Sequence, residues 1–248
     1  MTLLIIVFSV VLIGAFLQGA TGLGIGLTIA AVLPMFMTVK DTTLIVLTLL
    51  VVSGITVVSK YYRYIEWKPI RTFLVYVLVG RIAAFFILSE YGELEQIKVW
   101  LGFFLLLIVA YQLILSKLKG KTDVPNPTPK HVVVLILGML AGLTGGLFGI
   151  GGVFFASYFL LVYPSSKYRY IVGIQLTSVL SSGFSLTMHA FNGDFHSPLV
   201  AYLLVGTMAV VLGTYFGLKL LNIVNAAFIK RVILILISLA ALNLILFA

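Results

Sequence analysis

The sequence predicts an all-α membrane protein of two inverted repeats, each a glycine-broken helical hairpin followed by three transmembrane helices. Three observations support this fold class: an extreme composition, long apolar runs without charge, and glycine motifs that occur twice. Of the 248 residues, 62% are hydrophobic and 9% are charged, whereas about a quarter of the residues in soluble domains are charged. We therefore expect a multi-pass protein of the cell membrane, with the lipid bilayer as a partner.

Charge-free runs along the chain are long enough to cross a bilayer as helices. The longest are residues 1–39, 132–166 and 170–193, and a spanning helix needs about 20 apolar residues. Because the runs are continuous and not alternating, the spans should be helices and not barrel strands. This composition excludes a secreted domain, a cytosolic enzyme and an outer-membrane barrel. The lack of cysteine excludes disulfides and cysteine-ligated zinc.

The formal net charge of +9 does not indicate a nucleic-acid partner. A nucleic-acid footprint needs clustered Lys and Arg on one exposed face, and here the cations lie between the apolar runs. Positive loops that fix the orientation of a membrane protein explain the charge better. We expect neither a nucleic-acid partner nor a cofactor.

The same landmarks recur in the two halves of the chain. Gly24-Ile25-Gly26 is repeated 125 positions later as Gly149-Ile150-Gly151. The matches that lie 129 positions apart are Thr48 with Thr177, Ser53-Gly54 with Ser182-Gly183, and Pro69 with Pro198. The same order of landmarks at nearly the same spacing indicates a duplication.

A polar segment separates the two copies. Residues 117–130 contain three of the seven prolines, four lysines and one aspartate. We expect a first transmembrane repeat over residues 1–117, a cytoplasmic linker over 118–130 and a second transmembrane repeat over 131–248.

Each repeat divides into one long apolar segment with glycines and three ordinary spans. The glycine-rich segments cover residues 3–37 and 132–163, and the spans are predicted at 42–59, 70–89, 96–116, 170–189, 198–218 and 226–247. The glycine-rich segments are too long for one straight helix, and glycine destabilises a helix more than any residue but proline. We interpret each as two short half-helices joined at membrane depth by non-helical backbone.

Loop charges predict the orientation of the spans. Residues 60–71, 117–130 and 167–169 are net positive, whereas residues 90–98 and Asp194 are negative. By the positive-inside rule the first three loops are cytoplasmic and the last two are outside. The second broken segment joins two cytoplasmic loops, so it must enter and leave on one side. If the first does the same, the repeats are inverted, as in many transporters.

The helix breaks suit an anion-binding site. The N-terminus of a half-helix exposes N–H groups with a partial positive charge, and glycine lets a ligand approach the backbone. Small residues also allow tight helix packing, which is the alternative reading. The residues that we expect to bind substrate are Gln18, Thr21, Gly22, Gly24, Gly26, Arg81, Thr144, Gly145, Gly149, Gly151, Gly152, Gln175 and Thr177, with Ser178 as a further donor.

Arg81 is the one charged residue well inside a predicted span. A charge within the membrane is costly and marks a functional candidate. Arg81 either meets a sulfonate or carboxylate group, or it snorkels or pairs with a helix C-terminus. His189, at a span end, is better explained as an interfacial or capping residue than as a proton carrier. For Thr48, Ser53 and Ser182 packing is the favoured role.

Each half contains one glycine string. The first is Gly14-x4-Gly19-x-Thr21-Gly22-Leu23-Gly24-Ile25-Gly26, and the second is Gly138-x3-Gly142-x-Thr144-Gly145-Gly146-Leu147-Phe148-Gly149-Ile150-Gly151-Gly152. Together they resemble the TauE/SafE family of sulfite and organosulfonate exporters, over essentially the whole chain. The resemblance implies a transporter of small anions, often sulfur-containing ones. Leu27 stands where the second string has Gly152, which leaves an asymmetric site open.

The predicted function is the export of a small anionic substrate. No Asp or Glu falls inside a predicted span, so we do not expect a carboxylate proton relay. For an anion leaving a cell that is negative inside, the potential supplies roughly 2.3 kcal/mol per charge per 100 mV, and export needs no coupling ion. The alternatives are an intramembrane enzyme, for which the His-Glu-x-x-His and Gly-x-Ser-x-Gly motifs are missing, and an assembly subunit. The sequence leaves open the anion, the direction of transport and whether the chain forms a homo-oligomer.

Overall fold

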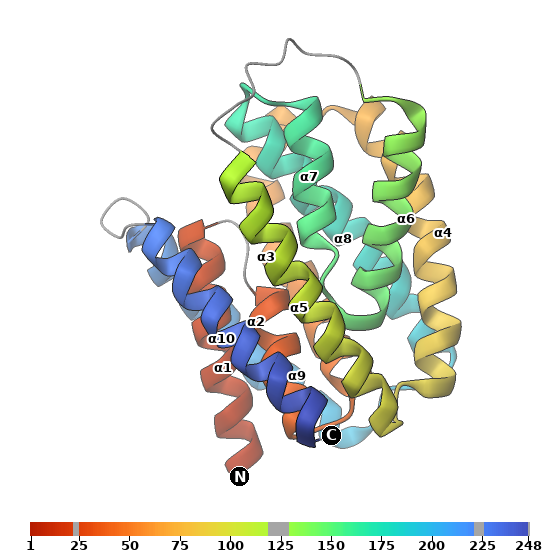
Figure 1. Ribbon diagram of the computed structural model, residues 1–248, viewed down its shortest axis with the longest axis vertical. Coiled ribbons are helices and arrows are strands. Elements are labelled where there is room, and N and C mark those ends of the chain that lie inside the picture. Colours follow the sequence, from red (N-terminus) through yellow and green to blue (C-terminus); the bar gives the residue numbers. More distant parts are fainter. Residues whose placement is uncertain (22–24, 119–128, 221–225, 248) are drawn as a thin grey trace.

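A computed structural model of the chain describes residues 1–21, 25–118, 129–220 and 226–247. Within these ranges the regular structure is entirely helical (Figure 1), so the predicted all-α fold class is confirmed. The elements are α1 (Thr2–Thr21), α2 (Ile25–Val32), η1 (Leu33–Met35), α3 (Val39–Tyr61), η2 (Tyr62–Tyr64), α4 (Trp67–Tyr91), α5 (Glu95–Leu118), α6 (His131–Phe148), α7 (Gly152–Val162), α8 (Lys167–Phe191), α9 (Ser197–Leu220) and α10 (Ala226–Phe247).

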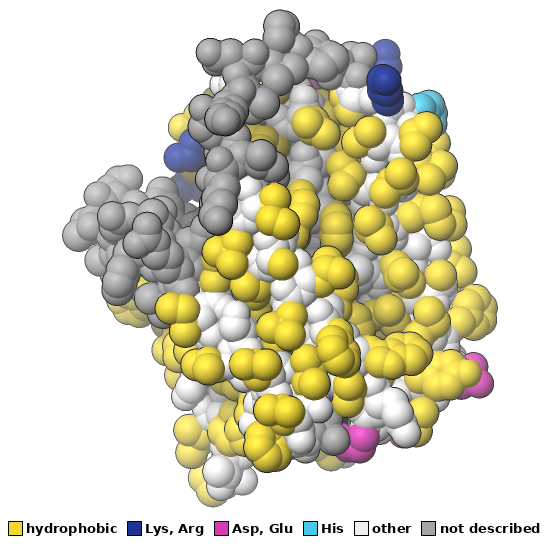
Figure 2. All heavy atoms as spheres, in the orientation of Figure 1, with side chains coloured by type: hydrophobic (Ala, Val, Ile, Leu, Met, Phe, Trp, Pro, Cys, Tyr) yellow, Lys and Arg dark blue, Asp and Glu magenta, His cyan; other side chains and the backbone are white. Residues whose placement is uncertain are grey.

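Six helices in the described part of the chain are long and apolar enough to cross a membrane. In the face shown in Figure 2, apolar side chains cover the flank of the molecule. Lys and Arg side chains lie at its upper end and Asp and Glu side chains at its lower end. Apolar flanks between two charged ends are what a multi-pass membrane protein requires.

The helices extend beyond the predicted spans by a few residues. α4 covers Trp67–Tyr91 instead of 70–89, and α8 covers Lys167–Phe191 instead of 170–189. The prediction ended each span near a charged residue. A helix continues through such positions at the membrane surface, because Lys and Arg side chains can place their charges in water. Most of the predicted linker, residues 119–128, lies outside the described residues.

Both glycine-rich segments contain two helices, but the arms of each pair are unequal. α1 and α6 have 20 and 18 residues, whereas α2 and α7 have 8 and 11. The interpretation as two short half-helices therefore holds only for the second arm. At 1.5 Å per residue the first arms are about 27–30 Å long. They are kept long by packing along a helix of the other repeat, α1 on α9 and α6 on α4.

Helices of one repeat pack mainly on helices of the other repeat. α1 packs along α9, and its counterpart α6 packs along α4; α3 packs on α8, and α5 on α10. In Figure 1, α1 rises from the N-terminus at the lower end, while α6 descends from the upper end. This arrangement is compatible with inverted repeats.

Glycines bring α4 and α6 into backbone contact. A Cβ at Gly80 would overlap the carbonyl oxygen of Met139, and a Cβ at Gly142 would overlap the carbonyl oxygen of Val77. Small residues of this kind allow helices to approach closely within a membrane. The contact holds the next residue of α4, Arg81, against the last turns of α6.

The charged loops gather at two ends of the bundle. At one end, which we call the basic end, Arg169 NH1 pairs with Glu66 Oε1 at 2.6 Å. At the other, the acidic end, Lys40 Nζ pairs with Asp194 at 2.7 Å and with Glu93 at 3.4 Å. This grouping agrees with the one that the loop charges predict.

The α6–α7 pair starts and finishes near the same end. The hydroxyl of Tyr76 lies 3.1 Å from Nδ1 of His131, the first residue of α6. In α7, the hydroxyl of Tyr158 donates to the carbonyl of Pro69 at 3.1 Å. Pro69 and Tyr76 both belong to the first half of α4, so the pair forms a hairpin at the basic end.

Engineered cysteines test which end faces the outside. The chain has no cysteine, and Glu93 and Lys167 are exposed at opposite ends. Glu93→Cys should react with an impermeant maleimide in intact cells, because the less positive end is expected outside. Lys167→Cys should react only after permeabilisation. Labelling of Lys167→Cys in intact cells would contradict the orientation.

Candidate functional site

The two helix breaks meet inside the bundle. Gly149, which follows α6, lies against Gly26 in the first turn of α2, where a Cβ at Gly26 would overlap the Gly149 carbonyl oxygen. A side chain at position 26 would prevent this approach. α2 and α7 thus begin close together, and the first N–H groups of each have no acceptor within their own helix.

A left-handed residue produces the break after α6. Gly149 has a φ of 72°, a conformation that glycine adopts without steric cost. Its N–H donates to the carbonyl of Gly145 at 3.1 Å, and the N–H of Ile150 donates to the carbonyl of Thr144 at 3.4 Å. These bonds satisfy the last carbonyls of α6. The chain resumes as α7 at Gly152.

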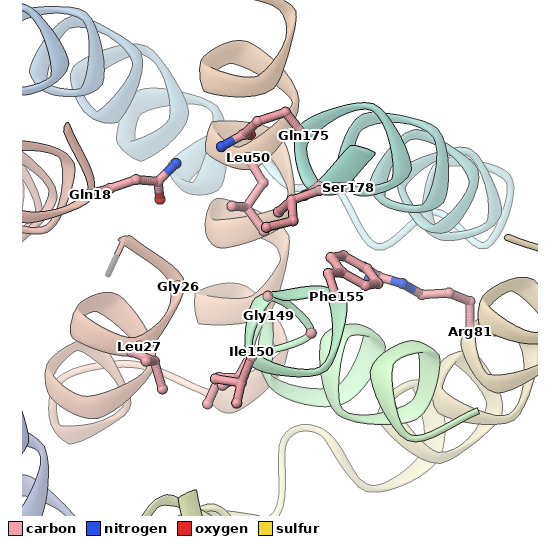
Figure 3. A pocket seen from close by; sticks show the side chains of 14 residues that line it. Gln18, Gly26, Leu27, Leu50, Arg81, Gly149, Ile150, Phe155, Gln175 and Ser178 are labelled. Atoms are coloured by element: carbon pink, nitrogen blue, oxygen red, sulfur yellow. The ribbon is translucent and has the colours of Figure 1, made fainter. Parts of the chain in front are cut away.

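A small cavity of about 40 Å³ lies where the breaks meet (Figure 3). A buried water needs at least about 10–15 Å³, so the cavity is large enough for a small ligand. Seven of the predicted site residues line it: Gln18, Gly26, Arg81, Gly149, Gly151, Gly152 and Gln175.

The other predicted site residues do not line the cavity or are not described. Thr144 is buried and donates its hydroxyl to the carbonyl of Leu140 in its own helix at 2.7 Å. Thr177 is also buried, and its hydroxyl oxygen has no partner. Gly145 contributes its carbonyl to Arg81. Gly22, Gly24 and the side chain of Thr21 lie outside the described residues.

The apolar part of the lining was not predicted. It consists of Leu27, Leu50, Ile150, Val153, Phe155 and Ile174. Ser178, which the sequence suggested as a further donor, also lines the cavity. An apolar span offers no compositional difference between a leucine that faces a cavity and one that faces lipid. The available signal was position, because Leu27 and Val153 directly follow the glycines Gly26 and Gly152.

Two glutamines bring amide groups to the cavity. Gln18 Nε2 donates to Ser53 Oγ at 3.2 Å, and Gln18 Oε1 accepts from the N–H of Ile25 at 3.3 Å. Gln18 therefore ties α1 to the first turn of α2, and Ser53 holds it in place. Gln175 of α8 is buried, and in Figure 3 its amide points toward that of Gln18.

Arg81 brings a positive charge to the cavity. It is 1% exposed, and in Figure 3 it extends from α4 with its guanidinium beside Phe155. Its NH1 donates to the carbonyl of Gly145 at 2.8 Å. That carbonyl belongs to the last turn of α6, where a cation is favoured by the helix dipole. Of the roles that the sequence allowed, pairing with a helix C-terminus is observed, and the buried side chain does not snorkel.

The rest of the Arg81 guanidinium is poorly satisfied. Its contacts with the hydroxyls of Ser181, Ser182 and Ser185 are 3.4–3.5 Å long, beyond the usual range of about 2.7–3.2 Å. Its Nε is buried without a partner. No carboxylate among the described residues forms an ion pair with Arg81. A buried charge without an opposite charge is costly, and a bound anion would provide that opposite charge.

Nearly the whole chain matches one protein family. The family model, described as sulfite exporter TauE/SafE, covers residues 6–244. The chain belongs to this family. No curated protein and no solved structure matches the chain. The TauE/SafE family consists of transporters, so the enzyme alternative has no support at the family level.

The two halves of this TauE/SafE chain contribute unequal groups to the site. The position that matches Arg81 at the offset of 129 is Val210, and the position that matches Gln175 is Val46. The glycine motifs are therefore duplicated, whereas the buried charge and the amide of Gln175 occur in a single copy.

The contact between the breaks can be tested with Gly26→Ala. The added Cβ meets backbone, which cannot move aside, so we expect a loss of about 1–3 kcal/mol and an unfolding temperature several degrees lower in detergent. Gly183→Ala is the matched control, because a Cβ there meets nothing within 4 Å; it should unfold within about two degrees of the wild type. Equal unfolding temperatures for both variants would show that the breaks do not need this contact.

Proposed function

We propose that the protein exports small anions, such as sulfite or short organosulfonates, and binds them in the cavity between the two helix breaks. One observation carries the proposal: two half-helix N-termini converge beside a buried arginine that has no carboxylate partner among the described residues. Helix N-termini attract anions through their free N–H groups and dipoles. Arg81 adds a full positive charge to these partial charges.

The size and lining of the cavity support a small substrate. A volume of about 40 Å³ excludes bulky ligands in the described conformation. Its wall combines a few polar groups with apolar side chains such as Leu50 and Phe155, as is typical of small-molecule sites. A short organosulfonate has the same combination, a charged head group beside a small apolar part.

The charge distribution supports export. No described Asp or Glu lies in the middle of a helix, so the membrane interior offers no carboxylate for proton coupling. The membrane potential favours the exit of an anion by roughly 2.3 kcal/mol per charge per 100 mV. The test is anion flux into liposomes in which the purified chain has been reconstituted. A transporter should produce flux, whereas an assembly subunit should produce none.

Variants of Arg81 test the anion site directly. Arg81→Gln should weaken the binding of methanesulfonate by about 1.5–3 kcal/mol, the scale of a hydrogen bond to a charged group. Arg81→Lys should recover part of the attraction but not bidentate recognition of the sulfonate. Titration of the purified proteins measures both effects.

Arg169→Gln is the matched control for these variants. Arg169 lies at the basic end with a half-exposed side chain, so its substitution should leave the affinity unchanged. Affinities within a factor of two for the wild type and both Arg81 variants would remove Arg81 from the site.

A further inference from the structure

Polar side chains form a buried stripe along α8. Gln175, Ser178, Ser182, Ser185 and His189 follow one another at intervals of three or four residues, so they share one face of the helix. None of them is more than 8% exposed. The stripe begins at the cavity, which Gln175 and Ser178 line. It ends at His189 near the acidic end.

Arg81 lies beside the middle of this stripe. Its NH1 is 3.5 Å from Ser185 Oγ, and its NH2 is 3.4 Å from Ser181 Oγ and 3.5 Å from Ser182 Oγ. The buried Nε has no partner at all. The guanidinium thus has one donor without an acceptor, and its bonds to the serines are long. The hydroxyls of Ser182 and Ser185 each have a hydrogen to donate, whereas Ser181 Oγ donates to the carbonyl of Ser178 through a long bond of 3.4 Å. Together with Arg81, the cluster can present several donors to an oxyanion.

A hydrogen bond and an ion pair of Asp194 lie at the acidic end of the stripe. Asp194 Oδ2 lies 2.6 Å from His189 Nδ1, and Asp194 Oδ1 lies 2.7 Å from Lys40 Nζ. Burial raises the pKa of Asp194, but hydrogen bonds from Lys40, His189 and Asn192 bring the pKa below its ordinary value. Asp194 is therefore ionised at neutral pH and holds the start of α3 against the end of α8.

We propose that Arg81 and the hydroxyls of Ser181, Ser182 and Ser185 form a second anion-binding position, between the central cavity and the acidic end. The inference rests on the proposed function, and its ligand is a small oxyanion such as a sulfonate. The anion moves from the cavity to this position along α8. It leaves when the contacts of Asp194 with Lys40 and His189 open.

The charges along the stripe select an anion. From Gln175 to Ser185 the stripe contains one amide and three hydroxyls, and the neighbouring charge is the cation Arg81. A cation path uses carboxylates or carbonyl rings, and no carboxylate lies on this stretch of α8. Asp194 stands at the far end, where Lys40 offsets its charge.

Cysteine reactivity tests this position. Ser185→Cys is treated in detergent with two methanethiosulfonates of similar size, one with a sulfonate group and one with a trimethylammonium group. We expect the ratio of the anionic to the cationic reaction rate to be at least ten times higher at Ser185→Cys than at Thr187→Cys. Thr187 lies on the exposed face of the same helix. Added methanesulfonate should slow the reaction. Ser182→Cys serves as a second reporter if Ser185→Cys unfolds at a lower temperature than the wild type.

The closing contacts are tested with a pair of aspartate variants. Asp194→Asn should raise the rate at Ser185→Cys several-fold. Asp41→Asn should not, because Asp41 pairs at the same end with His196, which lies outside α8. An equal preference for both reagents at positions 185 and 187, or no reaction at position 185 in the Asp194→Asn background, would overturn the proposal.

Anion flux by the wild-type protein distinguishes a failure of this proposal from a failure of the proposed function. If the wild type transports anions but the cysteine at position 185 shows no preference for the anionic reagent, the anion path lies elsewhere and the transport function is retained. Charge preference without flux of any small anion would reject transport but retain an anion-binding position at the serines.

Discussion

The backbone contact between Gly26 and Gly149 fixes the centre of this molecule. A broken helix leaves backbone polar groups that lipid cannot satisfy, so a break is tolerated only where protein surrounds it. Here the start of α2 covers the break after α6, because Gly26 has no Cβ to overlap the Gly149 carbonyl oxygen. The cavity and the converging half-helices follow from this contact, and the α4–α6 contact at Gly80 and Gly142 holds Arg81 beside them.

Much of this arrangement could be predicted from residue patterns, and the remainder depends on tertiary contacts. Charge-free runs located the spans, and glycine density located both breaks, because these features act locally along the chain. The unequal arms were missed, since the length of α6 depends on its packing against α4. The partners of Arg81 were missed for a similar reason. Gly145 and Ser185 lie 64 and 104 positions away in the sequence, and no local pattern connects them.

The glycine motifs of the site occur in both halves of the chain, but several of its polar side chains occur in one half. Ser182 and Ser185 of α8 are matched in α3 by Ser53 and Thr56, whereas Ser178 is matched by Leu49. A full buried polar stripe is thus present on α8 and only in part on α3. With Arg81 also in a single copy, positive charge lies to one side of the symmetric contact between the breaks. A framework with repeated glycine motifs therefore holds a polar site whose two sides differ.

The pairing of α1 with α9 and of α6 with α4 has a consequence for the unit that moves. Each pair joins the broken arm of one half of the chain to a span of the other half through extended helix contacts. Each of these paired units is therefore built from both halves of the chain. A half-chain expressed alone would lack the helix against which its own broken segment packs, and neither half could rock as an independent unit.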